Sequence, residues 1–241
     1  FRSGAALDEV GQVVKIGTDA GTAIGLGQVA SAIVSGGTNL AYIYPATAMS
    51  SKLPGVVAAD PSDIFAAAGA LQAVGGTGYR QAWDNNPNWV SLTTGRPLGN
   101  VYTSGNYIIL TGGPGVHNCI KYYMDLATGA DQSPAYFRAV NLGGVVYYQF
   151  ILRSSGSVIA SVPATDVTGL RRDLCLIQCF RDTDSRVALI ITGLTLKGTE
   201  AGAFWVVRNV IKNPSSFMGS IYVIGWNDLS TAWSNASVTL T

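Results

Sequence analysis

The most informative segment for the fold runs from Asn106 to Leu126 and reads NYIILTGGPGVHNCIKYYMDL. Its first part, Tyr107 to Thr111, is an unbroken apolar run rich in β-branched and aromatic residues, which is typical of a strand buried on both faces. Gly112 and Gly113 then allow a tight turn, and Pro114 suits the first turn of a helix. We therefore predict a central parallel strand, a glycine turn, and a helix with apolar residues at Val116, Ile120, Tyr123, Met124 and Ala127.

The N-terminal part of the chain repeats this unit in outline. Residues 12–17 predict a strand, residues 20–34 a helix capped by Thr18 or Asp19, and residues 40–44 a second strand. Two parallel strands joined in this way form a right-handed crossover. A second helix is predicted over residues 64–74, because Asp60-Pro61 is a strong helix start and Gly75-Gly76 is a stop.

The C-terminal half alternates antiparallel strand pairs with one long helix. Residues 135–140 and 145–152 predict a hairpin whose connection, Asn141 to Gly144, is longer than the ideal two-residue turn. The other elements that we expect here are an edge strand at 158–162, a strand pair at 173–181 and 187–193, a helix at 196–212 and a last core strand at 220–226.

Together these elements predict an α/β fold with a mixed, mainly parallel sheet built from strand–glycine turn–helix units, with antiparallel hairpins. Residues 1–11 have no clear period and are assigned to an N-terminal arm. Residues 12–234 are assigned to one α/β domain, in which residues 77–104 are rich in turn residues and predict an irregular insertion. Residues 235–241 alternate apolar and polar side chains, which predicts a C-terminal strand or tail.

The composition has few charges. Only 12% of the residues are charged, against about 25% in an ordinary soluble domain, and 48% are apolar. A secreted chain with much of its surface buried in an assembly would have this composition, as would an α/β core rich in small residues. We favour the assembly, because exposed apolar area marks contact surfaces.

The charge pattern and hydropathy also exclude some classes of partner. The net charge is +1, and Arg171-Arg172 is the only adjacent basic pair, so no basic stripe is available for nucleic acid. No run of about 18 apolar residues occurs, so we predict no membrane span in this chain. The first residue is Phe1 rather than Met, which a cleaved secretion signal or a removed tag would explain.

The three cysteines are Cys119, Cys175 and Cys179. On one strand, Cys175 and Cys179 would lie about 13 Å apart, too far for a bond to each other. Two alternatives stay open: a disulfide from Cys119 to Cys175 or Cys179, and three small buried thiols. With one histidine and no Cys-x-x-Cys pair, a zinc site of usual composition is not expected.

No motif for a cofactor or for catalysis is convincing. Gly25-x-Gly27-x-x-Ala30 formally matches a dinucleotide fingerprint, but it does not directly follow a strand and lacks the acid expected about 20 residues later. His117 has no recognisable nucleophile partner and is better explained as a capping or packing residue. Gly112, Gly113, Pro114 and Asn118 are interpreted as a structural turn, and we predict no enzyme, no cofactor and no metal.

Two kinds of modification or ion site are weaker suggestions. Asp182, Asp184 and the region of Asp84 are rich in oxygen ligands, which invites calcium, yet the surrounding residues first predict a turn and fit no EF-hand loop. Asn235-Ala-Ser is the only N-glycosylation sequon, because proline follows Asn213. Asn235 is therefore the candidate site for a glycan.

Three stretches together resemble the archaeal S-layer-like proteins: VKIGTDA at 14–20, YIILTGGPGVHN at 107–118 and VALIITGLTLKGTEAGAF at 187–204. In that family a VGS-x-A, a VGGP-x-x-N and an aG-x-T-x-x-GT-x-A-A strand–helix occur in this order. The resemblance covers roughly residues 12–36 and 105–228 and puts Asn118 on the family's asparagine. It implies a Rossmann-like surface-protein module without catalytic residues, and the chain length fits a filament, thread or pilus subunit.

The sequence thus predicts a structural subunit that polymerises with itself on the outside of an archaeal cell. The alternative is a secreted α/β domain that binds a small ligand or an ion at the turn from Gly112 to Asn118. A polymer of identical subunits needs a contact that does not close on itself, and addition of a terminal strand to a neighbour's sheet supplies one. The segments 1–11 and 235–241 are the candidates for such strands.

Overall fold

The main feature of the fold is one mixed sheet. The structure, a computed structural model, describes residues 24–46, 61–99, 106–124, 133–169, 172–227 and 238–239. The sheet has the order β10-β9-β7-β8-β3-β1-β2. Its strands are β1 (Leu40–Tyr44), β2 (Arg80–Trp83), β3 (Tyr107–Thr111), β7 (Arg172–Arg181), β8 (Val187–Gly193), β9 (Ile221–Asn227) and the short β10 (Val238–Thr239).

Most of these strands are parallel. β2, β1, β3 and β8 pair in parallel, and β7 pairs antiparallel with both β8 and β9. β3 is an interior strand with the parallel partners β1 and β8 on its two sides, so the predicted parallel strand inside the sheet is confirmed. All residues of β1 and β8 are buried, which explains why these strands read as continuous apolar runs.

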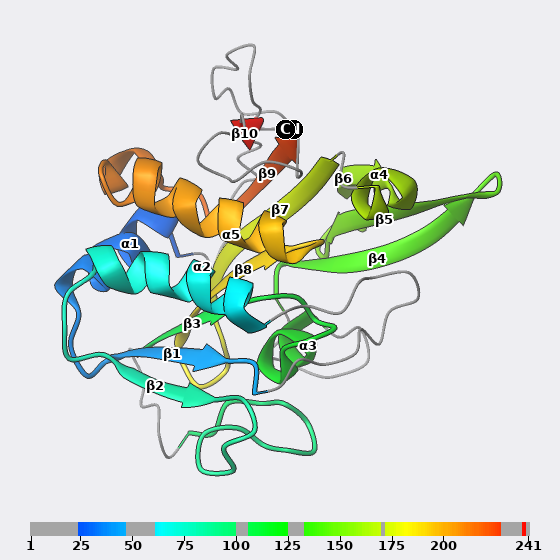
Figure 1. The fold of residues 1–241 in the computed structure, drawn as a ribbon. Helices are drawn as coiled ribbons and strands as arrows, with labels where there is room; N and C mark the ends of the chain where they lie inside the picture. The colour runs from blue at the N-terminus through cyan, green and yellow to red at the C-terminus, as the bar shows by residue number, and fades with distance from the viewer. Residues whose placement is uncertain are drawn as a thin grey trace.

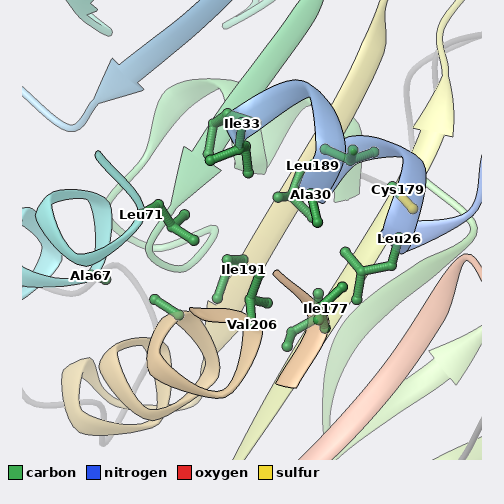
Figure 2. Packing of buried hydrophobic residues seen from close by; sticks show 14 of the residues in the cluster. Leu26, Ala30, Ile33, Ala67, Leu71, Ile177, Cys179, Leu189, Ile191 and Val206 are labelled. Carbon is green, nitrogen blue, oxygen red and sulfur yellow. The ribbon is translucent and has the colours of Figure 1, made fainter. Parts of the chain in front are cut away.

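Helices cover one face of the sheet (Figure 1). They are α1 (Leu26–Ser35), α2 (Pro61–Val74) and α5 (Leu196–Trp205), which continues into a π-helical turn, η1 (Val206–Val210). A short 3-10 turn, η2 (Pro214–Ser216), follows. Figure 2 shows buried side chains of these helical elements, among them Leu26, Ile33, Leu71 and Val206, in one cluster with Ile177 of β7 and Leu189 of β8.

The opposite face is covered by a small antiparallel sheet and two short helices. The sheet has the order β4-β5-β6, with β4 (Ala135–Leu142), β5 (Val145–Leu152) and β6 (Val158–Pro163). The helices are α3 (Asn118–Met124) and α4 (Ala164–Thr168). Their apolar side chains form a second buried cluster against the main sheet, so the described residues make a three-layer α/β arrangement.

Several predicted boundaries shift. The helix after β3 begins at Asn118 rather than near Pro114, because residues 114–116 form a turn first. α1 begins at Leu26, with Gly25 in extended conformation as its N-cap, so the expected start near Ala20 is wrong. The insertion at 77–104 is not wholly irregular: Arg80–Trp83 forms the edge strand β2, in which only Ala82 is buried, a pattern too short and polar to stand out.

The β4–β5 hairpin is tighter than the sequence predicts. β4 extends to Leu142, and the connection is the two-residue turn Gly143-Gly144. Both glycines have positive φ angles, 59° and 89°, as a type I′ turn requires. In Figure 1 the hairpin extends away from the body of the molecule.

α1 and α2 meet at their C-terminal ends. Gly76 N–H donates to Ile33 O over 3.0 Å. Gly36 has a φ of 66°, and a Cβ added there would lie 2.5 Å from the backbone of Gly76, so only glycine fits this crossing. The predicted stops of both helices at glycine are confirmed.

The three cysteines form no disulfide bond with one another. Cys119, Cys175 and Cys179 are free and buried. Cys119 packs in the cluster on one face of the sheet and the other two in the cluster on the opposite face, so the disulfide that the sequence allowed is not formed.

The predicted strand at 12–17, the arm at 1–11 and Asn235 lie outside the described residues. Val238–Thr239 pairs with β9 of its own chain. No helix among the described residues is long and apolar enough to cross a membrane.

Candidate functional site

Open α/β sheets bind ligands at the carboxyl edge of their parallel strands, at the point where strand order reverses. β1, β2 and β3 end there at Tyr44, Trp83 and Thr111, in pairing registers that bring their last residues to one edge. β3 and β2 lie on opposite sides of β1. The predicted turn from Gly112 to Asn118 follows β3 at this edge.

Asp84, directly after β2, fills the centre of this edge. Its carboxylate is buried and accepts two backbone hydrogen bonds, from Ala46 N–H to Oδ1 over 2.8 Å and from Asn118 N–H to Oδ2 over 2.7 Å. These donors come from the segments that follow β1 and β3. Asp84 therefore ties three strand ends together and satisfies the first N–H of α3.

His117 packs beside Asp84 and is completely enclosed. Its Nε2 lies 2.9 Å from Ile43 O, and Cys119 N–H donates to its Nδ1 over 3.2 Å. These partners require the neutral tautomer with the proton on Nε2. Burial lowers the pKa of His117 against the opposing effect of the Asp84 carboxylate, whose Oδ2 is 3.6 Å from Nδ1. Both ring nitrogens are thus engaged, as expected for a packing histidine.

The glycine turn itself is held by backbone bonds. Gly112 N–H donates to Ile191 O over 3.1 Å, and His117 N–H donates to Gly113 O over 3.0 Å. Gly112 has a φ of 125°, a conformation that L side chains rarely adopt. Gly113 does not share it, and a Cβ added there would have Gly193 O at 3.7 Å. Of the two glycines that the sequence assigned to this turn, Gly112 is therefore the one whose conformation requires glycine.

The N-terminus of α5, at the end of β8, holds a second buried carboxylate. Asp173 accepts hydrogen bonds from the backbone N–H of Leu194 over 3.2 Å and of Thr195 over 3.0 Å, and also from the Thr195 hydroxyl. A Cβ on Gly198 would lie 2.3 Å from Asp173 Oδ2. Asp173 thus occupies the position where a helix N-terminus would bind an external anion. Burial raises its pKa to about 7, against the lowering effect of these hydrogen bonds.

The dinucleotide-like glycines lie at the N-terminus of α1. Leu26 N–H donates to Gly219 O and Gly27 N–H to Phe217 O, each over 2.8 Å. A Cβ on Gly27 would lie 1.8 Å from Pro214 O. These glycines therefore serve close packing of α1 against the segment that precedes β9, and the N–H groups that would hold a phosphate are already bonded.

The Asp182–Ser185 turn contains an ionic cluster that the sequence analysis missed. Arg186 is fully buried, and its Nε donates to Asp182 Oδ2 over 2.7 Å, while the Tyr123 hydroxyl donates to the same oxygen over 2.9 Å. Arg186 Nη2 is 2.7 Å from Asp184 Oδ2, and Nη1 donates to Pro97 O over 3.0 Å. A guanidinium thus neutralises the two carboxylates that suggested calcium. The available signal was the arginine four residues after Asp182, directly before a buried strand.

The comparisons with known proteins bring no further assignment. No protein-family model matches the chain, and no curated protein and no solved structure matches it. The resemblance to archaeal S-layer-like proteins therefore rests on the three sequence stretches alone. Within the described residues, no group of three or more His, Cys, Asp or Glu side chains could hold a metal ion.

Proposed function

We propose that this protein is a structural subunit of a self-assembling polymer on the outside of an archaeal cell, such as a filament, a pilus, a thread or an S-layer-like array. The observation that carries the proposal is that the chain's own groups fill the positions where an α/β fold would hold a ligand. Asp84 and His117 fill the carboxyl edge, Asp173 fills the N-terminus of α5, and backbone carbonyls fill that of α1.

The surface supports the same proposal. Charged residues are only 12% of the chain, and several of those described are buried in the ionic cluster and at Asp84 and Asp173. Aliphatic side chains are well exposed instead, at Val34, Val74, Leu92, Leu142, Val145, Val146, Val158 and Met218. A surface with few charges and many exposed aliphatic groups suits a protein that works in contact with copies of itself.

The resemblance to archaeal S-layer-like proteins supports the cell-surface location and the archaeal origin in this proposal. Asn235 would then be accessible to glycosylation. Contact through the arm at residues 1–11 remains a prediction, whereas the pairing of Val238–Thr239 with β9 favours a role for the C-terminal strand within its own subunit.

The alternative function, binding of a small ligand or an ion at the turn from Gly112 to Asn118, has no observation in its favour. The N–H of Asn118 is committed to Asp84, and that of His117 to Gly113 O. A ligand would have to displace these bonds.

Electron microscopy of the purified protein tests the proposal. At micromolar concentration we expect regular filaments or arrays with one repeating subunit. Thermal unfolding in the presence of phosphate, sulfate, calcium or nucleotide is the parallel measurement, and we expect no rise in the midpoint. Dispersed single particles that a specific ligand stabilises would favour the alternative and refute the polymer.

A further inference from the structure

The β4–β5 hairpin carries apolar side chains on both faces of its tip, which we define as Val140 to Tyr147. Cross-strand pairing places Leu142 with Val145 on one face and Asn141 with Val146 on the other. Leu142 is 53% exposed, and Val145 and Val146 are each 41% exposed. A hairpin that only covered its own core would be apolar on one face, so apolar groups on both faces suit insertion into a partner.

The hairpin also lacks charge. No charged residue occurs between Arg138 and Arg153. Exposed strands in soluble proteins are usually protected from association by charged side chains, above all lysine, or by proline. The tip has no charged residue and no proline. It ends in the tight Gly143-Gly144 turn and projects from the body of the molecule (Figure 1).

A second uncharged surface lies where α1 and α2 end. No charged residue occurs between Asp19 and Lys52, or between Asp63 and Arg80. We define the helix-end surface as the exposed residues of 28–39 and 73–78, and its aliphatic members are Val34, 46% exposed, and Val74, 42% exposed.

The two surfaces lie on opposite sides of the molecule. In Figure 1 the hairpin tip extends to the right, whereas α1 and α2 end on the left, where their backbones touch. Two different surfaces at opposite ends give a heterologous contact that repeats without closing into a dimer. Neither surface has a charge that must be desolvated when the two meet.

We propose that the tip of the β4–β5 hairpin of one copy docks on the helix-end surface of the next copy, which makes the polymer head-to-tail. This inference rests on the proposed function, because it names the partner and the two faces of that same assembly. The occupant of the helix-end surface is thus a second copy of this chain.

Charge substitutions test each side of the contact. Val145→Lys on the tip and Val74→Glu on the helix-end surface each put an unpaired charge into the contact, and each should raise the critical concentration for polymerisation at least about tenfold. Val158→Lys is the matched control, because Val158 is 47% exposed on β6 of the same small sheet but lies outside the tip. Leu142→Lys is a second tip variant, and circular dichroism checks that each variant is folded.

Mixing the two variants is the decisive step. In an alternating polymer, Lys at position 145 of one variant would meet Glu at position 74 of the other, and the remaining contact would be wild type on both sides. We therefore expect the equimolar mixture to polymerise where neither variant does alone. A tip-to-tip contact would not give this result, since Val74→Glu would then assemble to the same extent as the wild type without the other variant.

The outcomes separate this inference from the proposed function. If the wild-type protein forms no polymer, the proposed function itself fails. If the wild type polymerises and folded Val145→Lys and Leu142→Lys polymerise equally well, the hairpin contact is refuted and the polymer stands. Loss of polymer on deletion of residues 1–11, together with normal assembly of the tip variants, would assign the contact to the N-terminal arm instead.

Discussion

The carboxyl edge of the main sheet buries polar groups, whereas the tip of the β4–β5 hairpin exposes aliphatic groups to solvent. At the edge, charged and polar groups such as Asp84 and His117 are buried and bonded to their own chain. At the tip, aliphatic groups such as Leu142 and Val145 are exposed and have no charge near them in the sequence. At the edge, where many α/β proteins hold ligands, the polar groups are bonded to their own chain, whereas the tip exposes aliphatic groups that we propose make contact with another copy.

This contrast has a physical consequence for mutations. A buried charge that loses its partner costs more than the pair contributes, whereas an exposed aliphatic residue contributes little to the stability of its own subunit. Changes inside should therefore affect folding, and changes at the tip should affect assembly.

Replacement of Arg186 by Gln should have the largest effect on folding. It leaves the Asp182 carboxylate buried without its cation, and we expect a loss of about 3 to 5 kcal/mol in the free energy of unfolding. Urea denaturation measures this, with Arg96→Gln as control, because the Arg96 side chain is 40% exposed in its pair with Asp184 and should contribute less than about 1 kcal/mol. Equal effects of the two variants would contradict the importance of burial.

Two helical glycines, Gly27 and Gly69, differ in the space available for an added Cβ atom. A Cβ at Gly27 would strike Pro214 O, whereas a Cβ at Gly69, within α2, meets no atom within 4 Å. We expect Gly27→Ala to destabilise the protein by about 3 kcal/mol through overpacking, and Gly69→Ala to stabilise it by about 0.5 to 1 kcal/mol. Denaturant midpoints of the pair, measured side by side, test this; a stabilising Gly27→Ala would overturn the packing assigned to the α1 N-terminus.

The stability of the protein should depend on pH because the pKa of Asp173 is raised in the folded state. Its pKa in the folded protein, about 7, lies above the ordinary value of 3.8, so between these pH values the folded state holds a proton that the unfolded state releases. The stabilisation that this bound proton gives the folded state is complete below about pH 4 and is lost as the pH rises to about 7. Between pH 5 and pH 7 we expect the free energy of unfolding to fall by about 2 kcal/mol for this reason.

Asp173→Asn provides the comparison, because the difference between wild type and variant cancels the other titrating groups. Among those groups is His117, whose lowered pKa acts in the opposite direction and destabilises the fold as the pH falls. Denaturation at pH 5 and pH 7 should show that Asp173→Asn loses less free energy of unfolding over this pH range than the wild type does. A difference that does not change with pH would mean that the hydrogen bonds to Asp173 outweigh its burial.

The smallest effect on stability should come from Val145→Lys. Val145 is exposed on the tip, so the free energy of unfolding should change by less than about 0.5 kcal/mol, although the same variant is expected to impair assembly. Denaturation and light scattering of one sample compare the two properties. A large loss of stability would show that the tip belongs to the core of its own subunit.

Much of the fold follows from local patterns in the sequence. β3 and β8 are apolar runs, and Pro61 and the glycines after α1 and α2 fix helix ends. β2 was missed because an edge strand of four residues has one buried side chain and no clear period. The sequence predicts too long a connection in the hairpin because it does not show that Asn141 and Leu142 belong to β4. Their pairing with β5 places them in the strand, and the intrinsic conformational preferences of the two residues do not reveal it.

The polar clusters were less accessible to sequence analysis. Asp84 and Asn118 lie far apart in the chain, and only the parallel register of β1, β2 and β3 brings their segments together. Arg186 was missed because an isolated arginine next to a turn is usually exposed. The packing role of His117 was predicted, but its partners Ile43 O and Cys119 N–H could not be.

Sedimentation velocity of the purified wild-type protein over a range of micromolar concentrations tests whether the protein assembles with itself. A structural subunit with filled ligand positions and two uncharged end surfaces should sediment as large species whose proportion grows with concentration. A single boundary at the mass of one chain, 25.1 kDa, across the whole range would contradict self-assembly and the function proposed from it.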